Sequence, residues 1–106
     1  AIEVVSMQPD MALHGLEGLK HMGSAIVPGI YDPTLADRDI PISTEEAYAM
    51  IKRVASQEGV LLGVSGGAAL AAVEKVAKDL ERGVIVTILP DSGNRYLSDP
   101  FWDELA

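Results

Sequence analysis

An unbroken run of apolar, mostly β-branched residues at positions 84–89, Val-Ile-Val-Thr-Ile-Leu, constrains the fold more than any other segment. Such a run is typical of a strand that is buried on both faces, as in the middle of a parallel sheet. Pro90 cannot donate to a sheet ladder, so we expect the strand to end there. The residues Asp91-Ser92-Gly93 then predict a tight polar turn. Because ligands bind at the carboxyl edge of strands in open α/β sheets, this turn would present the Ser92 hydroxyl to a ligand.

A helix is predicted directly after residue 42. Ser43 and Glu46 have the spacing of a capping box, with Ser43 as the N-cap. Gly59 is a natural residue at which the helix can end. Apolar residues recur between these limits at the spacing of one buried helical stripe, namely Ala47, Met50, Ile51 and Val54. We interpret this helix as structural, with a solvated charged face.

A second helix is predicted to begin at Ser65 and to extend to Arg82. Its first two turns, residues 66–73, are small or apolar on all sides, which predicts that this end is buried. Residues 74–82 carry alternating charges, which predicts that the other end lies near solvent. The Gly66-Gly67 pair could hold an anion through free N–H groups. We favour the alternative that these small residues let the helix pack closely beneath the sheet.

Few strands can be read from the sequence, which predicts that this chain is a piece of a larger protein. Residues 2–6 and 84–89 have strong strand patterns, and residues 60–63 have a weaker one. An α/β sheet usually has about five or six strands. The stretch between Met7 and Ile42 shows little periodicity, although long structureless loops are uncommon in compact domains. We therefore expect the chain to be the carboxyl-terminal third of an enzyme.

Composition excludes several classes of protein. The 106 residues make one domain at most. The formal net charge of −8, with scattered basic residues, argues against a nucleic-acid partner. No apolar stretch approaches the roughly 18 residues of a membrane span, and no targeting segment is visible, so a cytoplasmic location is expected. The absence of cysteine excludes disulfides and thiolate chemistry.

Residues 14–23 form a segment rich in glycine and histidine. Glycines that lie close together suit a backbone that must approach another group tightly, although a mobile surface loop is the alternative. His14 and His21 are seven positions apart, and no acidic residues converge with them in the sequence. Metal ligation would need further ligands and their supporting partners. We therefore expect no metal site and interpret both histidines as exposed loop residues.

Four segments, in this order, resemble the cysteine synthase (O-acetylserine sulfhydrylase) family of pyridoxal-phosphate enzymes. They are residues 16–19 (Leu-Glu-Gly-Leu), 26–32 (Ile-Val-Pro-Gly-Ile-Tyr-Asp), 58–69 (Glu-Gly-Val-Leu-Leu-Gly-Val-Ser-Gly-Gly-Ala-Ala) and 89–98 (Leu-Pro-Asp-Ser-Gly-Asn-Arg-Tyr-Leu-Ser). The resemblance covers nearly the whole chain. It implies a tryptophan synthase β-like fold, an α/β three-layer sandwich with a mostly parallel sheet. Residues 1–106 would be the carboxyl-terminal part of its large domain.

The resemblance also implies a cofactor and the residues that bind it. The cofactor would be pyridoxal 5′-phosphate, with Ser92 at its pyridine nitrogen, Gly18 beside it and Glu17 in the substrate loop. The insertion at residues 20–23, Lys-His-Met-Gly, departs from the shorter Gly-x-Gly form of most cysteine synthases and leaves the sulfur donor open. In the family, the Schiff-base lysine and the phosphate loop precede this region. None of the four lysines here lies in a similar motif, so the chain alone is expected to be inactive; they are Lys20, Lys52, Lys75 and Lys78.

The reaction implied is β-replacement on O-acetylserine, or on O-phosphoserine, by sulfide to give cysteine, in an enzyme expected to be a homodimer. A neutral Ser92 hydroxyl cannot keep the ring nitrogen protonated as a carboxylate would. The weaker electron sink favours β-elimination over transamination. A cystathionine β-synthase is the alternative within the fold, although residues 93–97 are more similar to cysteine synthases. A non-catalytic acidic interaction module is the alternative of another class.

Overall fold

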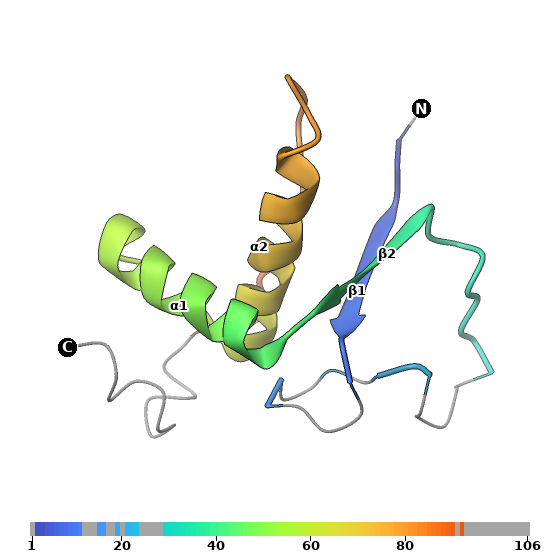
Figure 1. Ribbon diagram of the computed structural model, residues 1–106, viewed down its shortest axis with the longest axis horizontal. Helices are drawn as coiled ribbons and strands as arrows, with labels where there is room; N and C mark the ends of the chain where they lie inside the picture. The colour runs from blue at the N-terminus through green and yellow to red at the C-terminus, as the bar shows by residue number, and fades with distance from the viewer. Residues whose placement is uncertain are drawn as a thin grey trace.

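A computed structural model describes residues 2–11, 15–16, 19, 21–23, 29–90 and 92. Its elements follow one another in the order β1 (Val5–Pro9), β2 (Arg38–Ile42), α1 (Thr44–Glu58) and α2 (Val64–Ala77) (Figure 1). The strands form a parallel pair, with Val5 opposite Arg38 and Pro9 opposite Ile42. The helices pack on each other, and α2 also contacts both strands. The described part of the chain is therefore an α/β unit, as the sequence predicted.

The core lies where the two helices meet each other and the sheet. Ile42, Ile51 and Val64 are completely buried and come from β2, α1 and α2 respectively. Every buried side chain in the described core is apolar; the full set is Leu16, Ile40, Ile42, Ala47, Met50, Ile51, Leu62, Val64, Ala68, Ala71 and Ala72. Leu16 brings the segment before β2 into this core. The hydrophobic effect thus joins the loop region to both helices.

The two faces of the sheet differ in polarity. Successive side chains of a strand point to opposite faces, so Met7 and its partner Ile40 share the apolar face that packs on the core. Ser6 and Gln8 lie on the other face with Asp39. Asp39 accepts hydrogen bonds from the Ser6 hydroxyl at 2.7 Å and from the Gln8 amide at 2.5 Å. The polar face is thus held by side-chain hydrogen bonds across the two strands.

Helix α1 begins and ends as the sequence predicted. The Ser43 hydroxyl accepts the Glu46 N–H at 3.1 Å, and the Glu46 carboxylate accepts the Ser43 N–H at 2.9 Å. Gly59 follows the helix with φ +68°, a left-handed conformation that glycine adopts without steric cost. The predicted stripe is confirmed, because Ala47, Met50 and Ile51 are buried and Val54 packs against them.

Helix α2 is shorter than predicted, since it ends at Ala77 and not at Arg82. Its first two turns are mostly buried, its last turn is half-buried, and residues 77–82 are exposed, which agrees with the predicted change from a buried start to an end near solvent. The close packing occurs at Gly67 and is made to α1, whereas a Cβ atom on Gly66 would meet Leu89 and Leu62 at ordinary contact distances. A Cβ atom on Gly67 would lie 2.7 Å from the Ala47 carbonyl oxygen and would overlap the Ile51 side chain. The sequence therefore predicted the tight packing and missed its partner.

The strand predictions were partly wrong. The first strand covers residues 5–9 and not 2–6, while the segment at 60–63 makes only one isolated bridge, at Leu62. The sequence prediction missed β2, because Pro41 and the charged Arg38-Asp39 pair break the expected strand pattern. In the chain, β2 is stabilised by its long-range pairing with β1, which no local pattern reveals.

The run at residues 84–89 forms no strand ladder within the described part of the chain. Its side chains are largely exposed rather than buried on both faces, with Val84 at 90%, Val86 at 86% and Ile88 at 77%. A strand needs a neighbour to pair its backbone groups, and no described strand lies beside this run. The prediction of a buried parallel strand is thus contradicted for this chain by itself.

Candidate functional site

Ser92 lies at the amino-terminal end of α2. It forms an isolated antiparallel bridge with Leu62, two residues before the helix begins. Leu89, just before it, lies near Gly66 in the first turn of the same helix. The segment after α2 therefore runs back along the helix to its start. Ser92 is exposed there, after the end of the apolar run.

Several element ends meet at this end of the molecule. The carboxyl ends of β1 and β2 lie beside the amino ends of α1 and α2 (Figure 1). The Asp10 N–H donates to the Ile42 carbonyl at 3.0 Å, which continues the pairing just past both strands. Ser92 is held at the same end through Leu62. This is the sheet edge at which open α/β folds bind ligands.

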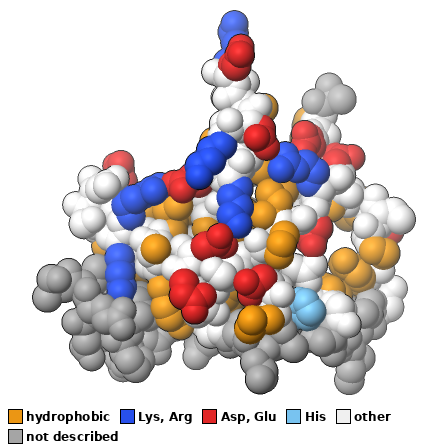
Figure 2. All heavy atoms as spheres, viewed as in Figure 1, with side chains coloured by type: hydrophobic (Ala, Val, Ile, Leu, Met, Phe, Trp, Pro, Cys, Tyr) orange, Lys and Arg blue, Asp and Glu red, His pale blue; other side chains and the backbone are white. Residues whose placement is uncertain are grey.

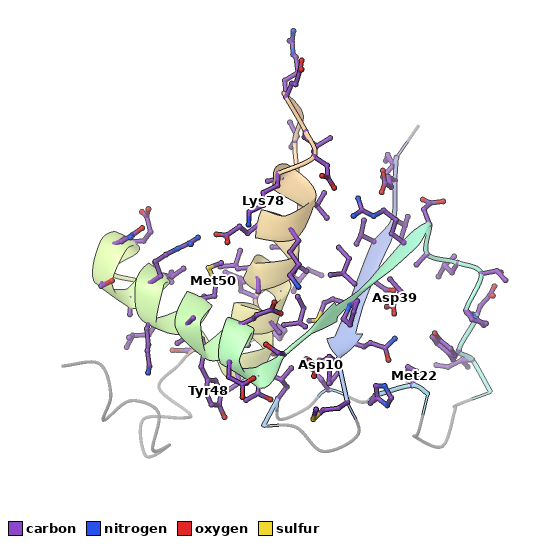
Figure 3. The ribbon with its side chains drawn as sticks, in the orientation of Figure 1. Asp10, Met22, Asp39, Tyr48, Met50 and Lys78 are labelled. Atoms are coloured by element: carbon purple, nitrogen blue, oxygen red, sulfur yellow. The ribbon has the colours of Figure 1, made fainter. Side chains whose placement is uncertain are left out.

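The described part of the glycine-rich segment is attached to the start of α1. The Gly15 N–H donates to the Thr44 hydroxyl at 2.9 Å, and the Tyr48 hydroxyl donates to the Gly15 carbonyl at 3.3 Å. Leu16 is completely buried, and its carbonyl accepts the Leu19 N–H at 3.2 Å. Tyr48 projects from α1 toward this segment (Figure 3). The loop backbone is thus fixed at the candidate edge.

Two predicted site residues, Glu17 and Gly18, lie outside the described residues, as does His14. Their neighbours Leu16 and Leu19 are both packed against the core. Their contact with a cofactor or substrate stays a prediction.

Gln8 is a site-positioning residue that the sequence analysis missed. Its side-chain carbonyl accepts the Met22 N–H at 2.8 Å, and its amide nitrogen donates to Asp39. Met22 belongs to the insertion at residues 20–23, so Gln8 connects the described part of that insertion, residues 21–23, to the polar face of the sheet. The alternation of Ser6 and Gln8 with the apolar Val5 and Met7 was a signal of this face, but the loop contact is long-range.

Lys75, in the last turn of α2, and Lys78, which follows the helix, lie at its carboxyl end, far from Ser92. The Lys75 ammonium lies 2.9 Å from the Glu46 carboxylate of α1, and Lys78 follows the far end of the helix (Figure 3). A helix rises about 1.5 Å per residue, which puts Lys78 roughly 20 Å along the axis from the end that carries Ser92. Both lysines serve the mixed charged surface that covers the helices (Figure 2).

Hydrogen bonds and charges perturb three carboxyl groups. Burial acts to raise the pKa of Glu46, but the Ser43 N–H and the Lys75 ammonium outweigh it and lower the pKa below its ordinary value. The hydrogen bond from Arg53 is the main cause that lowers the pKa of Glu74. The Thr34 hydroxyl lowers the pKa of Asp32 in the same way. The lowered pKa favours the charged form of all three carboxyl groups, and each of them accepts a hydrogen bond within the fold.

Comparison with known proteins identifies the family. The family model described as pyridoxal-phosphate dependent enzyme matches residues 6–91. The chain belongs to this family of pyridoxal-phosphate dependent enzymes. The resemblance seen in the four sequence segments is thereby confirmed, and the fold class with it.

Within the pyridoxal-phosphate family, the chain is similar to cysteine synthases and to a cystathionine beta-synthase. A cysteine synthase of Aquifex aeolicus is 43% identical over 97% of this chain and 33% of its own length. A cysteine synthase structure from Entamoeba histolytica superposes with a TM-score of 0.87 at 32% identity, over 97% of this chain and 33% of that one. An O-acetylserine dependent cystathionine beta-synthase structure from Helicobacter pylori superposes with a TM-score of 0.83 at 30% identity. This match covers 96% of this chain and 35% of that one. The chain spans about a third of the length of the relatives it matches.

No helix in the described ranges has the length and apolar character that a membrane crossing requires.

Proposed function

We propose that this chain is the carboxyl-terminal part of the large domain of a pyridoxal-phosphate dependent cysteine synthase. The observation that carries the proposal is the 43% identity to a cysteine synthase along 97% of the chain. The position of Ser92 at the carboxyl edge of the sheet supports it, because ligands bind there in this class of fold. The cofactor lysine and the phosphate loop would come from segments that precede this chain in the polypeptide.

The residues at this edge suit the cofactor. When bound, pyridoxal phosphate supplies the conjugated ring that withdraws electrons from the substrate. Ser92 offers a hydroxyl that can donate or accept a hydrogen bond at a ring nitrogen. Ser92 is exposed at the start of α2. Gly18 would line the cofactor and Glu17 the substrate.

The proposed reaction replaces one substituent on the β-carbon of an amino acid. The bond from that carbon to the acetate or phosphate oxygen breaks, and a bond to the sulfur of sulfide forms. The residues of this chain would orient the substrate and shield it from water. A neutral Ser92 leaves the ring a weaker electron sink than a carboxylate would, which suits elimination and replacement. Gln8 would set the position of the loop at residues 21–23.

The Helicobacter pylori structure supports a second candidate, a cystathionine β-synthase type of replacement. This candidate differs in the incoming nucleophile, which would be the thiol of an amino acid instead of sulfide. We favour the cysteine synthase, because the Aquifex aeolicus protein shares more identity with the chain. We also propose a homodimer in the cytoplasm as the assembled form.

The test uses the longer polypeptide that contains this chain, purified with pyridoxal phosphate. O-acetylserine and O-phosphoserine are each supplied with sulfide, and cysteine is quantified; parallel reactions replace sulfide by homocysteine. Cysteine formation from sulfide, with little cystathionine, is the expected result. Preferred use of homocysteine would support the second candidate instead. No turnover of any pair by the cofactor-loaded protein would favour the non-catalytic interaction module. Gel filtration of the same sample measures the oligomeric state.

A further inference from the structure

Two hydroxyl groups on the first turns of α1 bind both backbone polar groups of one loop residue. The Gly15 N–H donates to the Thr44 hydroxyl at 2.9 Å, and the Tyr48 hydroxyl donates to the Gly15 carbonyl at 3.3 Å. Thr44 and Tyr48 are four positions apart, so they lie on the same face of the helix, one turn from each other. The two side chains form a notch, here called the Gly15 notch, that holds the backbone of this residue.

The geometry of the Gly15 notch explains why residue 15 is a glycine. Among the described residues, positive φ angles occur only at Gly59 and Gly83, so the backbone conformation of Gly15 does not require a glycine. Space does require it, because a Cβ atom at position 15 would lie 2.6 Å from the Tyr48 hydroxyl and 3.0 Å from the Thr44 methyl group. A side chain here would push Tyr48 away from the Gly15 carbonyl. The missing side chain thus permits the close approach that the hydrogen bonds need.

The Gly15 notch belongs to a rigid part of the molecule. The capping box at Ser43 fixes the start of α1, and the ring of Tyr48 packs against the buried core. Leu16, which follows Gly15 directly, is completely buried. Side chains on a packed helix hold a geometry more precisely than side chains on a loop do. The position of Gly15 is therefore determined by α1.

The position of Gly15 bears on substrate binding in the proposed cysteine synthase. Glu17, the residue proposed to line the amino-acid substrate, is only two positions after Gly15 in the chain. The amino end of α1 lies at the carboxyl edge of the sheet, where open α/β folds bind ligands (Figure 1). When only part of the molecules have a loop in the binding position, the apparent affinity for the ligand falls with that fraction. Contacts that favour the held position of Gly15 would therefore raise the affinity for the substrate.

We propose that Thr44 and Tyr48 are positioning residues, which hold Gly15 so that the segment after it can bind the amino-acid substrate. This inference rests on the proposed function, which assigns Glu17 to the substrate. Neither hydroxyl touches the substrate in this arrangement, because both act through the backbone of Gly15. The alternative is a purely structural role, in which loss of the hydroxyls lowers stability and leaves the affinity for the substrate unchanged.

The first test measures hydrogen exchange in the longer polypeptide, loaded with pyridoxal phosphate and free of substrate. Tyr48→Phe retains the packed ring and removes only the hydroxyl. Exchange of the Gly15 amide should become about five times faster, the effect of one ordinary hydrogen bond, although this amide donates to Thr44 and not to Tyr48. Tyr31→Phe is the matched control, because Tyr31 is exposed and its hydroxyl makes no hydrogen bond in the described part of the chain. An unchanged Gly15 rate in Tyr48→Phe would overturn the proposal.

The second test is steady-state kinetics, with O-acetylserine or O-phosphoserine varied at saturating sulfide. The double variant Thr44→Val/Tyr48→Phe should raise KM for the amino acid at least about threefold and change kcat less than about twofold, because the Gly15 notch acts on binding and not on the reacting atoms. Thr44→Ser retains a hydroxyl and should keep the KM of the unaltered protein. A lower thermal midpoint with an unchanged KM in the double variant would show the purely structural role and overturn the proposal. A fall in kcat at unchanged KM would also overturn it.

The two tests separate this inference from the proposed function. A protein that makes no cysteine would contradict the proposed function. Exchange of the Gly15 amide would then still decide on the Gly15 notch: a faster rate in Tyr48→Phe would support the hold on the loop, and an unchanged rate would overturn it. A protein that makes cysteine, with the same substrate KM in the double variant, would contradict this inference alone.

Discussion

The side-chain carbonyl of Gln8 accepts the backbone N–H of Met22 at 2.8 Å, which attaches the loop at the candidate site to β1. The amide nitrogen of Gln8 donates to Asp39 of β2, so one side chain connects both strands and the loop. Gln8 is thus a positioning residue: it acts on the site through the loop that it holds.

Gln8→Ala should release the Met22 amide. A hydrogen bond of this kind contributes about 1 kcal/mol, so exchange of that amide should become roughly five times faster. Ser6→Ala is the control, because the Ser6 hydroxyl also bonds to Asp39 but makes no hydrogen bond to residues 21–23 of the loop. Hydrogen exchange followed by NMR measures both. An unchanged Met22 rate in Gln8→Ala would show that other contacts hold the loop.

Gly67→Ala should destabilise the fold, although alanine favours helix more than glycine does. The added Cβ would lie 2.7 Å from the Ala47 carbonyl oxygen and overlap Ile51, and overpacking of this kind costs about 1–3 kcal/mol. Gly66→Ala is the matched control, since its Cβ would meet its nearest atom at 3.5 Å. That variant should be neutral or more stable by up to about 1 kcal/mol. Urea unfolding of both variants provides the comparison; equal midpoints would refute the packing argument.

Ser43→Ala should remove the N-cap of α1 at a cost of about 1 kcal/mol. The Ser43 hydroxyl accepts the Glu46 N–H at the helix start, whereas Ser56 donates to the Arg53 carbonyl within the helix. Ser56→Ala is therefore the control and should change the free energy of unfolding by less than about 0.5 kcal/mol. Thermal unfolding followed by circular dichroism measures both, and similar losses would argue against the capping role.

The lowered pKa of Glu46 predicts a loss of stability in acid. The Ser43 N–H and Lys75 favour the charged carboxylate in the folded state, against the effect of burial. The contribution is complete above the unfolded pKa, near 4.5, and is lost as the pH falls through the lower folded pKa. Glu46→Gln should therefore show a weaker fall of the urea midpoint between pH 6 and pH 3. A parallel fall in the two proteins would contradict the prediction.

Ser92→Ala and Ser92→Asp, made in the longer polypeptide, should separate cofactor binding from turnover. Ser92→Ala should retain pyridoxal phosphate, because the other cofactor contacts dominate its affinity. Ser92→Asp should hold the ring nitrogen protonated and reduce the rate of β-replacement at least about tenfold, a change of roughly 1.4 kcal/mol in the barrier. Cofactor absorbance and cysteine formation are the two readouts. Full activity of the Ser92→Asp variant would show that Ser92 does not lie at the ring nitrogen.

Local signals in the sequence predicted the helices well. The capping box at Ser43 and Glu46, the stripe at residues 47–54 and the stop at Gly59 depend only on near neighbours, and all are confirmed. β2 could not be predicted in the same way, because Pro41 hides its pattern and its pairing with β1 spans more than thirty residues. The predicted burial of residues 84–89 was wrong, because a strand needs a neighbour and no described strand lies beside this run.

At the candidate site, too, local signals could be read from the sequence and long-range contacts could not. A turn at Ser92 was predicted from the strand pattern and Pro90; the structure describes Ser92 alone of this turn, at the start of α2, and no strand at residues 84–89. The loop contacts that fix Gly15 to Thr44 and Met22 to Gln8 join residues far apart in sequence. Side-chain amides and hydroxyls bind many partners, so residue type alone did not indicate these pairs.

The exposed run at residues 84–89 has a consequence for how the chain can be made. It is uncharged, rich in β-branched residues and free of proline, which is the composition of segments that stack into cross-β fibrils. Expressed by itself, the chain would present this run to other copies. Exposed, uncharged and β-branched backbone of this kind recruits further copies edge to edge, so aggregation during expression is the expected fate of the chain made alone.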